Sequence, residues 1–406
     1  MAIVSSQGTI GKRVFYAKAV YGREEINAVM KSMENGWLAS GPLVKQFEQS
    51  VASLFGKKYG IAVNSGSSAN LLVISALGAQ KGSEIITPAC TFSTTVSNIV
   101  NCGYKPVFVD SVVGRYTINE DLVEAAINSK TCAIMVPQLI GGICDMPRLY
   151  EIAKKHNLVL IDDSCDTLAP TIKGHQVSRY AHVSTTSFYG SHIITACGMG
   201  GMIMTNNKEY RDKMVSLRDW GRVGNDAEAF ENRFDFEIDG IPYDAKFLYT
   251  GFGYNLKMNE VAAAFGLEQL KRLTRFTQKR KKNFEKLYNF FSNYEEHFHL
   301  PELIKGATTN WLAFPLTIRK EAPFKRYDLL KHFEKDGIQT RVLFSGNITR
   351  HPVYKDHPLT WRQVGELSKS DFIMANGFLI GAHQGMGDRE IEIIADSAMR
   401  FFNQYE

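Results

Sequence analysis

Short apolar runs alternate with longer helical stretches from about residue 43 to residue 205. In the helical stretches, such as Asn119–Ile127 and Met146–His156, apolar residues recur at intervals of three and four, which predicts amphipathic helices. Most of the short runs are largely apolar, as strands are when both faces of a sheet are covered. The predicted strands are Tyr59–Val63, Glu84–Thr87, Pro106–Val109, Cys132–Val136, Leu158–Ile161, Thr185–Phe188 and Met202–Thr205. The pattern predicts an α/β fold with a mainly parallel sheet that binds ligands at the carboxyl ends of its strands.

The rest of the chain follows a different pattern. The polar and charged segment Val223–Lys246 predicts a long loop, since loops of this length carry little regular structure. A helix is predicted at Asn259–Leu273, and we interpret the basic stretch Arg275–Lys282 as the solvated face of a helix rather than a binding patch. From Trp311 onward a second alternation of strands and helices indicates a smaller α+β domain.

Composition excludes several classes of protein. Of the 406 residues 44% are hydrophobic and 22% charged, which is typical of a globular chain and not of a disordered or fibrous one. The net charge of +5 is small and no basic run is interleaved with aromatic residues. We therefore expect no nucleic-acid partner, although mild basicity suits an anionic substrate.

Targeting signals and cysteine pairs are not evident in the sequence. No apolar run approaches the roughly 18 residues of a membrane span, and Met1–Arg13 lacks the apolar core of a secretory signal. The six cysteines form no C-x-x-C pair, so a disulfide framework is not expected. We expect a cytoplasmic enzyme without a membrane partner.

Three segments contain residues suited to chemistry. In the first, Gly66 and Ser67 follow a predicted strand and open a helix, so their N–H groups could bind a phosphate; an ordinary serine-capped helix is the equal alternative. In the second, Asp162 and Asp163 end an apolar strand. We expect Asp162 to cap the next helix, whereas a buried Asp163 would need a partner such as a protonated heterocyclic nitrogen.

The third segment runs from Ser187 to Thr195 and leads into the glycine-rich stretch Gly198–Gly201. It places a hydroxyl and an imidazole, that of His192, at a predicted strand end. A single histidine is more often structural than catalytic, so this segment alone does not identify an active site.

Taken together, these segments resemble the DegT/DnrJ/EryC1/StrS family of pyridoxal-phosphate sugar aminotransferases. The resemblance extends from Asn35-Gly36-Trp37 to Phe378-Leu379-Ile380-Gly381. It implies the aspartate-aminotransferase-like fold (fold type I), with a mostly parallel seven-stranded sheet, a smaller α+β domain and a homodimer whose active sites lie at the interface. We expect a large cofactor-binding domain at residues 1–260, a small domain at 261–406, and a segment 1–35 able to pack on the small domain.

The resemblance also implies the cofactor site. Its expected residues are Gly66, Ser67, Phe92, Asp163, Asp166, Ser187 and Asn255. In the family, the equivalents of Ser67 and Ser187 bind the cofactor phosphate, and an aromatic residue at the position of Phe92 stacks on the pyridine ring. The equivalent of Asp163 pairs with the protonated pyridine nitrogen, which keeps the ring an electron sink. The equivalent of Asn255 reaches the cofactor phosphate of the partner subunit.

One position departs from the family pattern. The lysine that carries the cofactor lies five residues after the equivalent of Ser187, and His192 stands there in this chain. No lysine occurs between Lys173 and Lys208. An imidazole cannot anchor the cofactor covalently but can move a proton. The resemblance therefore implies non-covalent pyridoxal or pyridoxamine phosphate, with His192 as the catalytic residue.

This exchange of lysine for histidine is similar to that of the family's sugar 3-dehydratases, which act on CDP- or GDP-linked 4-keto-6-deoxyhexoses in deoxysugar biosynthesis, including that of lipopolysaccharide O-antigen. The dehydratases that act on the CDP-linked sugar carry an iron–sulfur cluster. In this chain, however, Val223–Lys246 has no cysteine and Cys197 is the last cysteine. Four thiolates usually hold such a cluster, so we expect neither cluster nor other metal. The resemblance then implies glutamate as amino donor.

Three alternatives remain open at this point. The chain could be a nucleotide-sugar aminotransferase, a dehydratase that lacks a cluster but still needs a reductase, or a degenerate member without activity. Arg218 and Arg222 could bind the nucleotide phosphate or pair with nearby acids, and a site role for His383 is no better than even.

Overall fold

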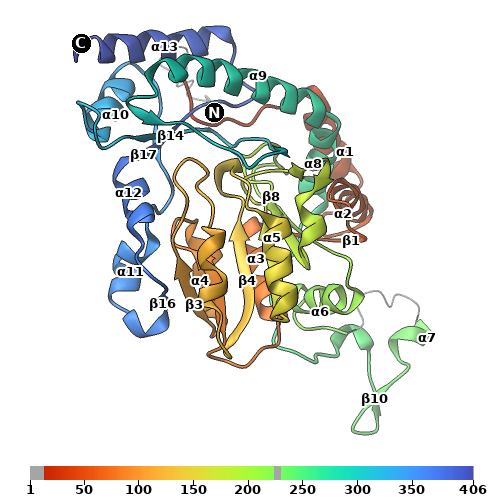
Figure 1. Ribbon diagram of the computed structural model, residues 1–406. Coiled ribbons are helices and arrows are strands. Elements are labelled where there is room, and N and C mark those ends of the chain that lie inside the picture. Colours follow the sequence, from red (N-terminus) through yellow and green to blue (C-terminus); the bar gives the residue numbers. More distant parts are fainter. Residues whose placement is uncertain (1–12, 224–229, 406) are drawn as a thin grey trace.

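A mostly parallel sheet forms the centre of the molecule in the computed structural model, which describes residues 13–223 and 230–405 (Figure 1). Its strand order is β1-β9-β8-β5-β4-β2-β3-β16. The bounds are β1 (Tyr59–Val63), β2 (Glu84–Pro88), β3 (Lys105–Val109), β4 (Thr131–Pro137), β5 (Val159–Asp163), β8 (Val183–Ser187), β9 (Gly201–Thr205) and β16 (Arg362–Gln363). Strand β9 runs antiparallel to its neighbours β1 and β8, and the other pairs are parallel. The seven predicted strands are confirmed, and β16 from the C-terminal part extends the sheet beside β3.

Helices cover both faces of this sheet because the strand residues alternate between the faces. Ile134 and Val136 of β4 pack with α5 (Met146–Lys155), whereas Ala133 and Met135 pack on the opposite face. That second face is covered by α3 (Gly66–Ala76), α4 (Ser93–Asn101) and α6 (Lys208–Arg218). Near β1 and β9 the first face is covered by α2 (Pro42–Leu54) and α8 (Glu260–Lys271).

Helix α5 shows how the local sequence specifies these elements. Its apolar residues at positions 146, 149, 152 and 153 form one buried face, as the three- and four-residue spacing predicts. Asp145 accepts a hydrogen bond from the Arg148 N–H at 3.2 Å and caps the N-terminus. Lys154 and Lys155 lie in the last turn, where the helix dipole favours cations.

The predicted helix Asn119–Ile127 is wrong, because this stretch forms two separate 3₁₀ turns at Glu120–Leu122 and Glu124–Ala126. The buried carboxylate of Glu120 accepts hydrogen bonds from Arg115 Nη2 at 2.7 Å and from the Asp145 N–H at 2.8 Å. These contacts tie the start of the stretch to neighbouring loops, and a continuous helix would break them.

A smaller antiparallel sheet lies beside the central one. Its order is β12 (Phe298–His299), β14 (Phe314–Ile318), β17 (Gly377–Ile380) and β15 (Arg341–Val342). Three helices pack their apolar residues against it: α9 (Leu273–Phe291), α10 (Arg326–Lys335) and α13 (Asp388–Phe402). This confirms the second alternation of strands and helices after Trp311.

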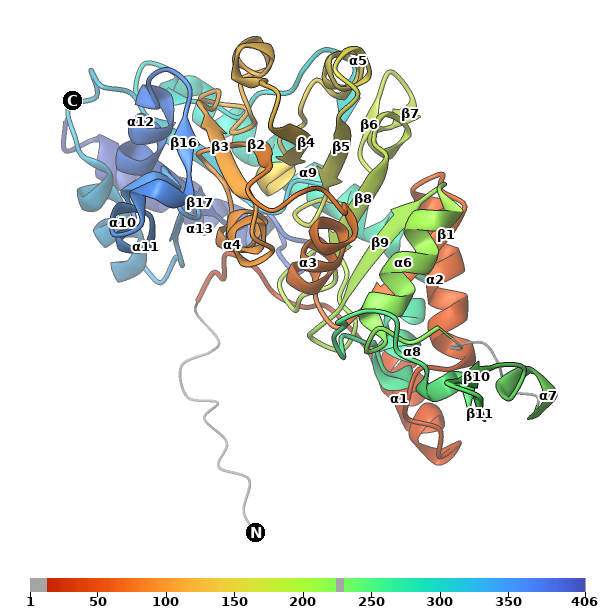
Figure 2. The ribbon, with the colours of Figure 1, turned by 90° about the horizontal axis from the view of Figure 1, so that it is seen from below.

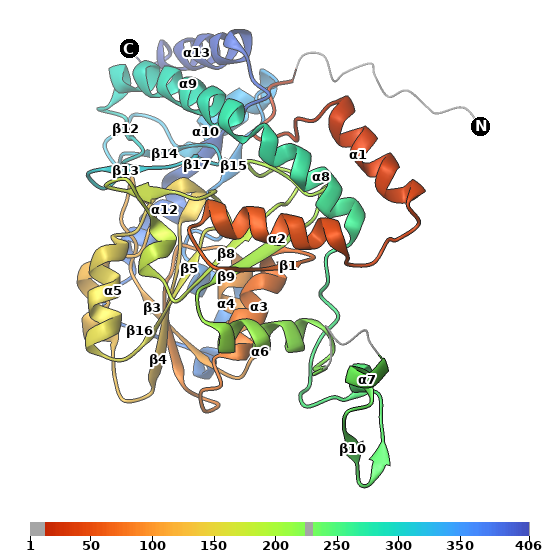
Figure 3. The ribbon, with the colours of Figure 1, turned by 90° about the vertical axis from the view of Figure 1, so that its right-hand side faces the viewer.

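We propose that the chain divides into two domains near residue 260, with a large domain at residues 1–260 and a small domain at residues 261–406. Two connections cross this boundary. Val14 forms a parallel bridge with Ile338, so the described start of the chain packs on the small sheet, while β16 joins the large one. Helix α1 (Arg23–Glu34) lies along α8 (Figure 3).

The segment predicted as the loop Val223–Lys246 includes residues 224–229, which lie outside the described residues. The remainder holds a short helix, α7 (Phe230–Arg233), and a hairpin of β10 (Glu237–Ile238) and β11 (Ile241–Pro242). Asp239 and Gly240 between the two strands both have positive φ, at 52° and 78°, which suits a tight hairpin turn. The hairpin projects from the body of the molecule (Figure 2).

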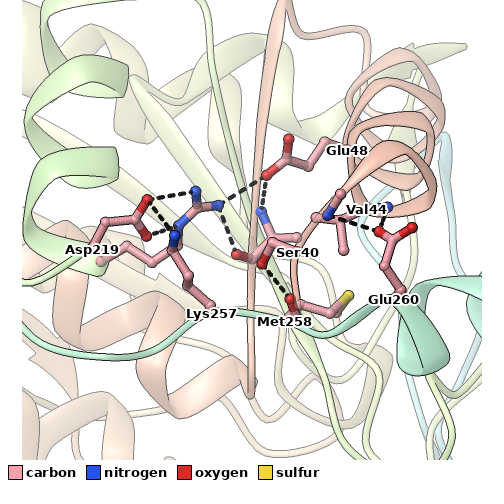
Figure 4. Close-up of polar contacts among 10 residues, drawn as sticks. Ser40, Val44, Glu48, Asp219, Lys257, Met258 and Glu260 are labelled. Carbon is pink, nitrogen blue, oxygen red and sulfur yellow. Dashed lines mark hydrogen bonds and ion pairs between the residues drawn. The ribbon is translucent and has the colours of Figure 1, made fainter. Parts of the chain in front are cut away.

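A polar network fixes α2 and the stretch before α8 to the central sheet (Figure 4). The Glu48 carboxylate accepts hydrogen bonds from the Ala62 N–H at 2.8 Å and from Arg218 Nη1 at 3.0 Å. Arg218 also donates to Asp219 at 2.8 Å, which in turn lies 3.2 Å from Lys257 Nζ. Arg218 is therefore a buried structural residue and not a free phosphate ligand.

Glu260 supplies the N-terminal cap of α2 from another helix. The N-cap residue of α2 is Gly41, which has no side chain to do so. The buried Glu260 carboxylate accepts from the N–H groups of Gly41 at 2.9 Å, Leu43 at 3.0 Å and Val44 at 2.8 Å. Three otherwise unpaired donors of the helix start are thereby satisfied by one negative charge.

Replacing Glu260 by glutamine should destabilise the protein by about 2 kcal/mol, because an amide cannot accept from all three donors and charged hydrogen bonds are the stronger ones. The change is measured as a lower thermal midpoint at fixed protein concentration. Glu268→Gln on the same helix removes only an i,i+3 pair with Lys271 and should change stability by less than about 0.5 kcal/mol. Equal midpoints for the two variants would contradict the capping role.

Candidate active site

A cavity of about 440 Å³ lies where the carboxyl ends of β4, β5 and β8 meet the start of α3. Tyr16, Leu312 and Phe344, from outside the central sheet, complete its wall. Seven of the eight predicted site residues line this cavity: Gly66, Ser67, Phe92, Asp163, Asp166, Ser187 and His192. The strand order thus brings together residues that are up to 126 positions apart in the sequence (66 to 192).

The start of α3 forms one end of the cavity. Ser65 is the N-cap and its side chain accepts from the Ser68 N–H at 3.1 Å, so the expected serine cap is present. The N–H groups of Gly66 and Ser67 have no acceptor within the helix, because they belong to its first turn. A Cβ atom on Gly66 would lie 2.7 Å from both Cys165 Sγ and Ser187 Cβ. Glycine lets the helix begin against the ends of β5 and β8, and leaves two donors facing the cavity.

Asp163 is held in place by three neighbouring elements. Its Oδ2 accepts from Asn70 Nδ2 of α3 and from Thr95 Oγ1 of α4, both at 2.8 Å. Thr185 of β8 donates to Asn70 Oδ1 at 2.7 Å, which fixes the orientation of the Asn70 amide. The Asp163 side chain is 3% exposed. A buried carboxylate in this setting is a rigid acceptor at the cavity floor.

Asp162 points to the other face of the sheet, as alternation along β5 requires. Its Oδ1 accepts from Gln138 Nε2 at 2.9 Å and from Ser164 Oγ at 2.8 Å. The expectation that Asp162 caps a following helix is wrong, because turns and not a helix follow β5. Burial raises the pKa of Asp162 to about 6.

Asp166 connects the cavity to the loop after β4. Its Oδ2 accepts from the Ile140 N–H at 2.9 Å, and Ile140 has a positive φ of 61°. Burial raises the pKa of Asp166 to about 7, the Ile140 hydrogen bond opposes this, and the nearby Asp163 charge adds to it. Near neutral pH, Asp166 can therefore hold or release a proton.

The turn after β8 carries Ser187 and His192. The Ser187 hydroxyl accepts from the Tyr189 N–H at 3.3 Å and keeps its own proton for another partner. The Nδ1 atom of His192 is buried and has no hydrogen-bond partner among the described residues. Burial lowers the pKa of His192 to about 4, so the imidazole is neutral at pH 7.

These residues fit the pyridoxal phosphate that the resemblance implies. The N–H groups of Gly66 and Ser67 with the hydroxyls of Ser67 and Ser187 suit a phosphate. The ring of Phe92 is 47% exposed and contacts Phe344 edge-on at 5.5 Å, so a face remains for stacking. Asp163 suits a protonated ring nitrogen, and the unpaired Nδ1 of His192 marks a place for a polar partner. No lysine lines the cavity within the described part of the chain.

Asn255 is the one predicted residue that the structure places outside this cavity. It is exposed and bridges to Asp219. The neighbouring Leu256 carbonyl accepts from the Asn64 N–H at 2.9 Å, next to the start of α3. The role that the resemblance gives Asn255 needs a second copy of the chain, and it stays a prediction.

Other residues marked in the sequence have structural contacts. The His383 imidazole is buried, donates from Nε2 to the Phe15 carbonyl and accepts at Nδ1 from the Gly385 N–H, both at 3.1 Å. Both ring nitrogens are thus used, and His383 does not line the cavity. Arg222 lies over the Trp220 ring at 4.4 Å, outside the cavity as well.

Sequence reasoning missed Asn70, Thr95 and Thr185, which hold Asp163. A weak signal was available. Asn70 lies one helical turn after Gly66, so its side chain must face the same sheet edge. Thr95 lies one turn into the helix that Phe92 caps. The contributions of Tyr16, Leu312 and Phe344 depend on how the small sheet packs, which no local pattern encodes.

No helix among the described residues is long and apolar enough to cross a membrane. No group of three or more His, Cys, Asp or Glu side chains in the described part of the chain could hold a metal ion.

The raised pKa of Asp162 leads to a prediction for the cofactor-free protein. The folded protein keeps this proton up to about pH 6, whereas an unfolded chain releases it near pH 4. The contribution of Asp162 to stability therefore falls as the pH rises from about 4 to 6. Asp162→Asn should gain stability relative to the wild type over this range, measured by thermal unfolding.

Asp121→Asn is the control, because Asp121 is exposed and makes only a surface pair with Arg148. Its midpoint should follow that of the wild type across the same range. If the difference between Asp162→Asn and the wild type is the same at pH 4 and pH 6, the buried proton is not there.

Comparison with known proteins identifies a family and a set of relatives. Residues 20–398 match the model of the DegT/DnrJ/EryC1/StrS aminotransferase family. The chain is 35% identical over 397 residues to the lipopolysaccharide biosynthesis protein RfbH of Salmonella typhimurium, with 94% of this chain and 90% of that protein covered. It is 34% identical over 402 residues to the dTDP-4-dehydro-2,6-dideoxy-D-glucose 3-dehydratase of Saccharopolyspora spinosa, covering 94% of this chain and 85% of that one.

A solved structure is similar over the same length. The GDP-4-keto-6-deoxy-D-mannose 3-dehydratase of Escherichia coli, with bound hydrated PLP, superposes with a TM-score of 0.86 at 26% identity. The match covers 95% of this chain and 98% of that chain. The similarity confirms the expected fold class, a PLP-dependent aminotransferase-like α/β fold.

Proposed function

The chain belongs to the DegT/DnrJ/EryC1/StrS aminotransferase family of sugar-modifying, pyridoxal-phosphate-dependent enzymes, and on this premise we propose that it is a 3-dehydratase of nucleotide-linked 4-keto-6-deoxyhexoses. In this proposal it removes the 3-hydroxyl group and uses glutamate as amino donor. The observation that carries the proposal is His192, which lines the cavity at the position of the family's lysine and whose Nδ1 has no hydrogen-bond partner among the described residues.

The cofactor would be held without a covalent bond. Gly66, Ser67 and Ser187 would bind its phosphate, and Phe92 would cover its ring. Asp163, fixed by Asn70 and Thr95, would hold the ring nitrogen protonated, with Asp166 at the same edge. When bound in the pyridoxamine form, the cofactor supplies an amino group for the substrate ketone and an electron sink beside it.

His192 would move the protons of the reaction. Its imidazole is neutral at pH 7 because burial lowers the pKa to about 4, so it can accept a proton at once. The protonated imidazole can then donate this proton to the departing 3-hydroxyl oxygen. General acid–base help of this kind is worth about 10²–10⁴-fold in rate. A lysine would instead bind the cofactor and compete for the same position.

Two partners belong to the proposed function: a second copy of the chain and a nucleotide-linked sugar. We infer a homodimer in which Asn255 of each copy serves the cofactor of the other, since the cavity is lined by no lysine or arginine from the described residues of its own chain. An anionic phosphate there has only neutral donors and a helix start. A nucleotide-linked sugar from deoxysugar or O-antigen synthesis fits the similarity to RfbH and to the 3-dehydratases.

A sugar aminotransferase is the second candidate, because the matching family is described as an aminotransferase family. Such an enzyme would keep the oxygen at carbon 3 and place nitrogen at carbon 4. A third possibility is a dehydratase that takes electrons from a reductase in place of amino groups from glutamate. These three differ in their products and co-substrates, so one assay separates them.

The product of the purified protein should lack the carbon-3 oxygen when it is given pyridoxal phosphate, glutamate and a 4-keto-6-deoxyhexose. The CDP-, GDP- and dTDP-linked sugars are tested separately, without reductase, and the masses of the products are measured by mass spectrometry. The nucleotide sugar with the highest rate identifies the preferred substrate. An amino sugar that retains the oxygen would contradict dehydration, and turnover only with added reductase would contradict the role of glutamate.

His192→Asn should lower kcat by about 10²–10⁴-fold, because the variant lacks the proton-transfer group. Binding of the cofactor, followed by its absorbance, should change little, since His192 gives it no covalent bond. His192→Lys serves as the complementary variant: it should bind the cofactor covalently, trapped by borohydride, and lose dehydration. Wild-type dehydration by either variant would show that His192 is not the base.

The two neighbouring aspartates provide a matched pair. Asp163→Asn should weaken cofactor binding and remove activity, because an amide does not hold the ring nitrogen protonated. Asp162→Asn, one residue away but on the other face of the sheet, should leave the affinity within about threefold, since charge at this distance acts through a screened field. Titration of the cofactor-free variants with pyridoxal phosphate measures both. Equal losses would remove Asp163 from the proposed site.

A further inference from the structure

The turn that carries His192 is held from outside the cavity. Gln384 Nε2 donates to the Ile193 carbonyl at 3.1 Å, and Gln269 Oε1 accepts from the Thr195 N–H at 3.4 Å. Arg280 Nη2 donates to the carbonyl of His192 itself at 3.4 Å. Because the Nδ1 atom of His192 has no hydrogen-bond partner among the described residues, the position of the imidazole depends strongly on the backbone of this turn.

Arg280 is unusual among the cations of the described chain. It lies on α9 within the basic stretch Arg275–Lys282, and most of that stretch is solvated as predicted, but Arg280 is only 2% exposed. None of the ion pairs found among the described residues includes it; its acceptors are backbone carbonyls, those of Trp311 at 2.9 Å and Leu312 at 3.0 Å besides His192. Its Nε has no acceptor within residues 13–223 and 230–405. A buried charge without a counter-ion is costly, so a specific benefit must offset it.

The carbonyls that Arg280 holds belong to the two sides of the cavity. Leu312 lines the cavity from the small unit. Its N–H donates to the Ile140 carbonyl at 2.7 Å, and the Ile140 N–H donates to Asp166 at 2.9 Å. Through Arg280, the His192 turn is thus connected by hydrogen bonds to the wall that contains Leu312 and Asp166.

We propose that Arg280 is a positioning residue for His192: it fixes the His192 turn against the Trp311–Leu312 segment and, as a buried cation behind that turn, adds to the effect of burial in disfavouring a second positive charge on the imidazole. The inference deepens the proposed function, on which it rests for the role of His192 as a base. It assigns a second, electrostatic use to a residue that touches neither substrate nor cofactor.

The charges around His192 support the second part of this proposal. Burial contributes most to the low pKa of His192, polar contacts with the backbone of Ser187 and Cys165 oppose it, and the Arg280 charge lowers it further. The same charge also acts behind the turn on His383, whose pKa is lowered to about 3, mainly by burial. The titratable groups that face His192 across the cavity are Asp163, Cys165, Asp166, Tyr16 and Tyr189.

The test compares Arg280→Met, Arg280→Lys and the wild type in two ways. In the cofactor-free proteins, modification of His192 by diethyl pyrocarbonate is followed between pH 3 and pH 8 by peptide mass spectrometry, because the reagent attacks the neutral and not the protonated imidazole. In the loaded enzymes, kcat and KM are measured separately. Thermal unfolding verifies that each variant is folded.

Arg280→Met should move the midpoint of His192 modification to higher pH, since the cation that disfavours a second positive charge is gone. Its kcat should fall on the order of 10²-fold, as for a misplacement of about 1 Å, while KM changes by less than about threefold. Arg280→Lys keeps the charge but not the fork of donors. It should retain the wild-type midpoint and still lose kcat.

Arg326→Lys is the matched control. Arg326 also donates to two backbone carbonyls, those of Met374 at 2.6 Å and Gly377 at 3.0 Å, but it does not line the cavity. This variant should leave both the midpoint and kcat near the wild type. A folded Arg280→Met with an unchanged midpoint, or Arg280 variants with kcat within twofold of the wild type, would overturn the proposal.

The two readouts also separate this inference from the proposed function. The modification midpoint of His192 is measured without cofactor or substrate, so it reports on Arg280 whichever reaction the enzyme performs. If the sugar product shows an aminotransferase but the midpoint still moves, the proposed function fails and the electrostatic role of Arg280 stands. If dehydration is found and the midpoint does not move, the proposed function stands and the electrostatic role of Arg280 fails.

Discussion

The fixed carboxylate of Asp163 is the constraint on which the rest of the site depends. It lies at the end of β5, and its hydrogen bonds come from α3 and α4, with Thr185 of β8 fixing the amide of Asn70. The position of the acid therefore defines the relative placement of four elements. An acceptor held this way can stabilise a positive charge on a ligand at no cost in reorganisation, and in the proposed function this charge is that of the cofactor ring.

Glycine and serine at the start of α3 supply a second part of the site. Gly66 is required there because any side chain would collide with Cys165 and Ser187. The close approach brings the helix start, with its free N–H groups and positive dipole, to the ends of β5 and β8. The helix start thus favours an anion and Asp163 a cation, which matches the charges of a phosphorylated pyridinium.

Histidine in place of lysine changes what this scaffold can do. A lysine side chain would both hold the cofactor covalently and serve as the base. The imidazole of His192 can serve as a base but cannot hold the cofactor covalently. Within the described residues the Nδ1 atom of His192 has no hydrogen-bond partner, so the position and the pKa of the imidazole depend on the backbone and on the surrounding residues. The contacts of Arg280, Gln269 and Gln384 with the turn provide such a support.

Much of the fold followed from local pattern. Short runs of four or five residues rich in apolar and β-branched types predicted the seven strands of the large sheet, since strands covered on both faces contain few charged or turn-forming residues. The stretch Asn119–Ile127 failed because a buried acid, Glu120, bonds to neighbouring loops and overrides helical periodicity. The strand β16 was not predicted, because a strand of two residues is too short to show a hydrophobic periodicity.

By itself the sequence determined the sheet, the residues at its strand ends and the loss of the family's lysine, because each depends on residue types at short spacing. Tertiary structure decided which of these residues share a cavity, which aspartate faces it and what holds them. Asp162 and Asp163 are adjacent in the chain, and only the pleat of β5 sends them to opposite faces. Arg280 looked like one of several solvated cations, and only the packing of α9 against the His192 turn shows it to be buried.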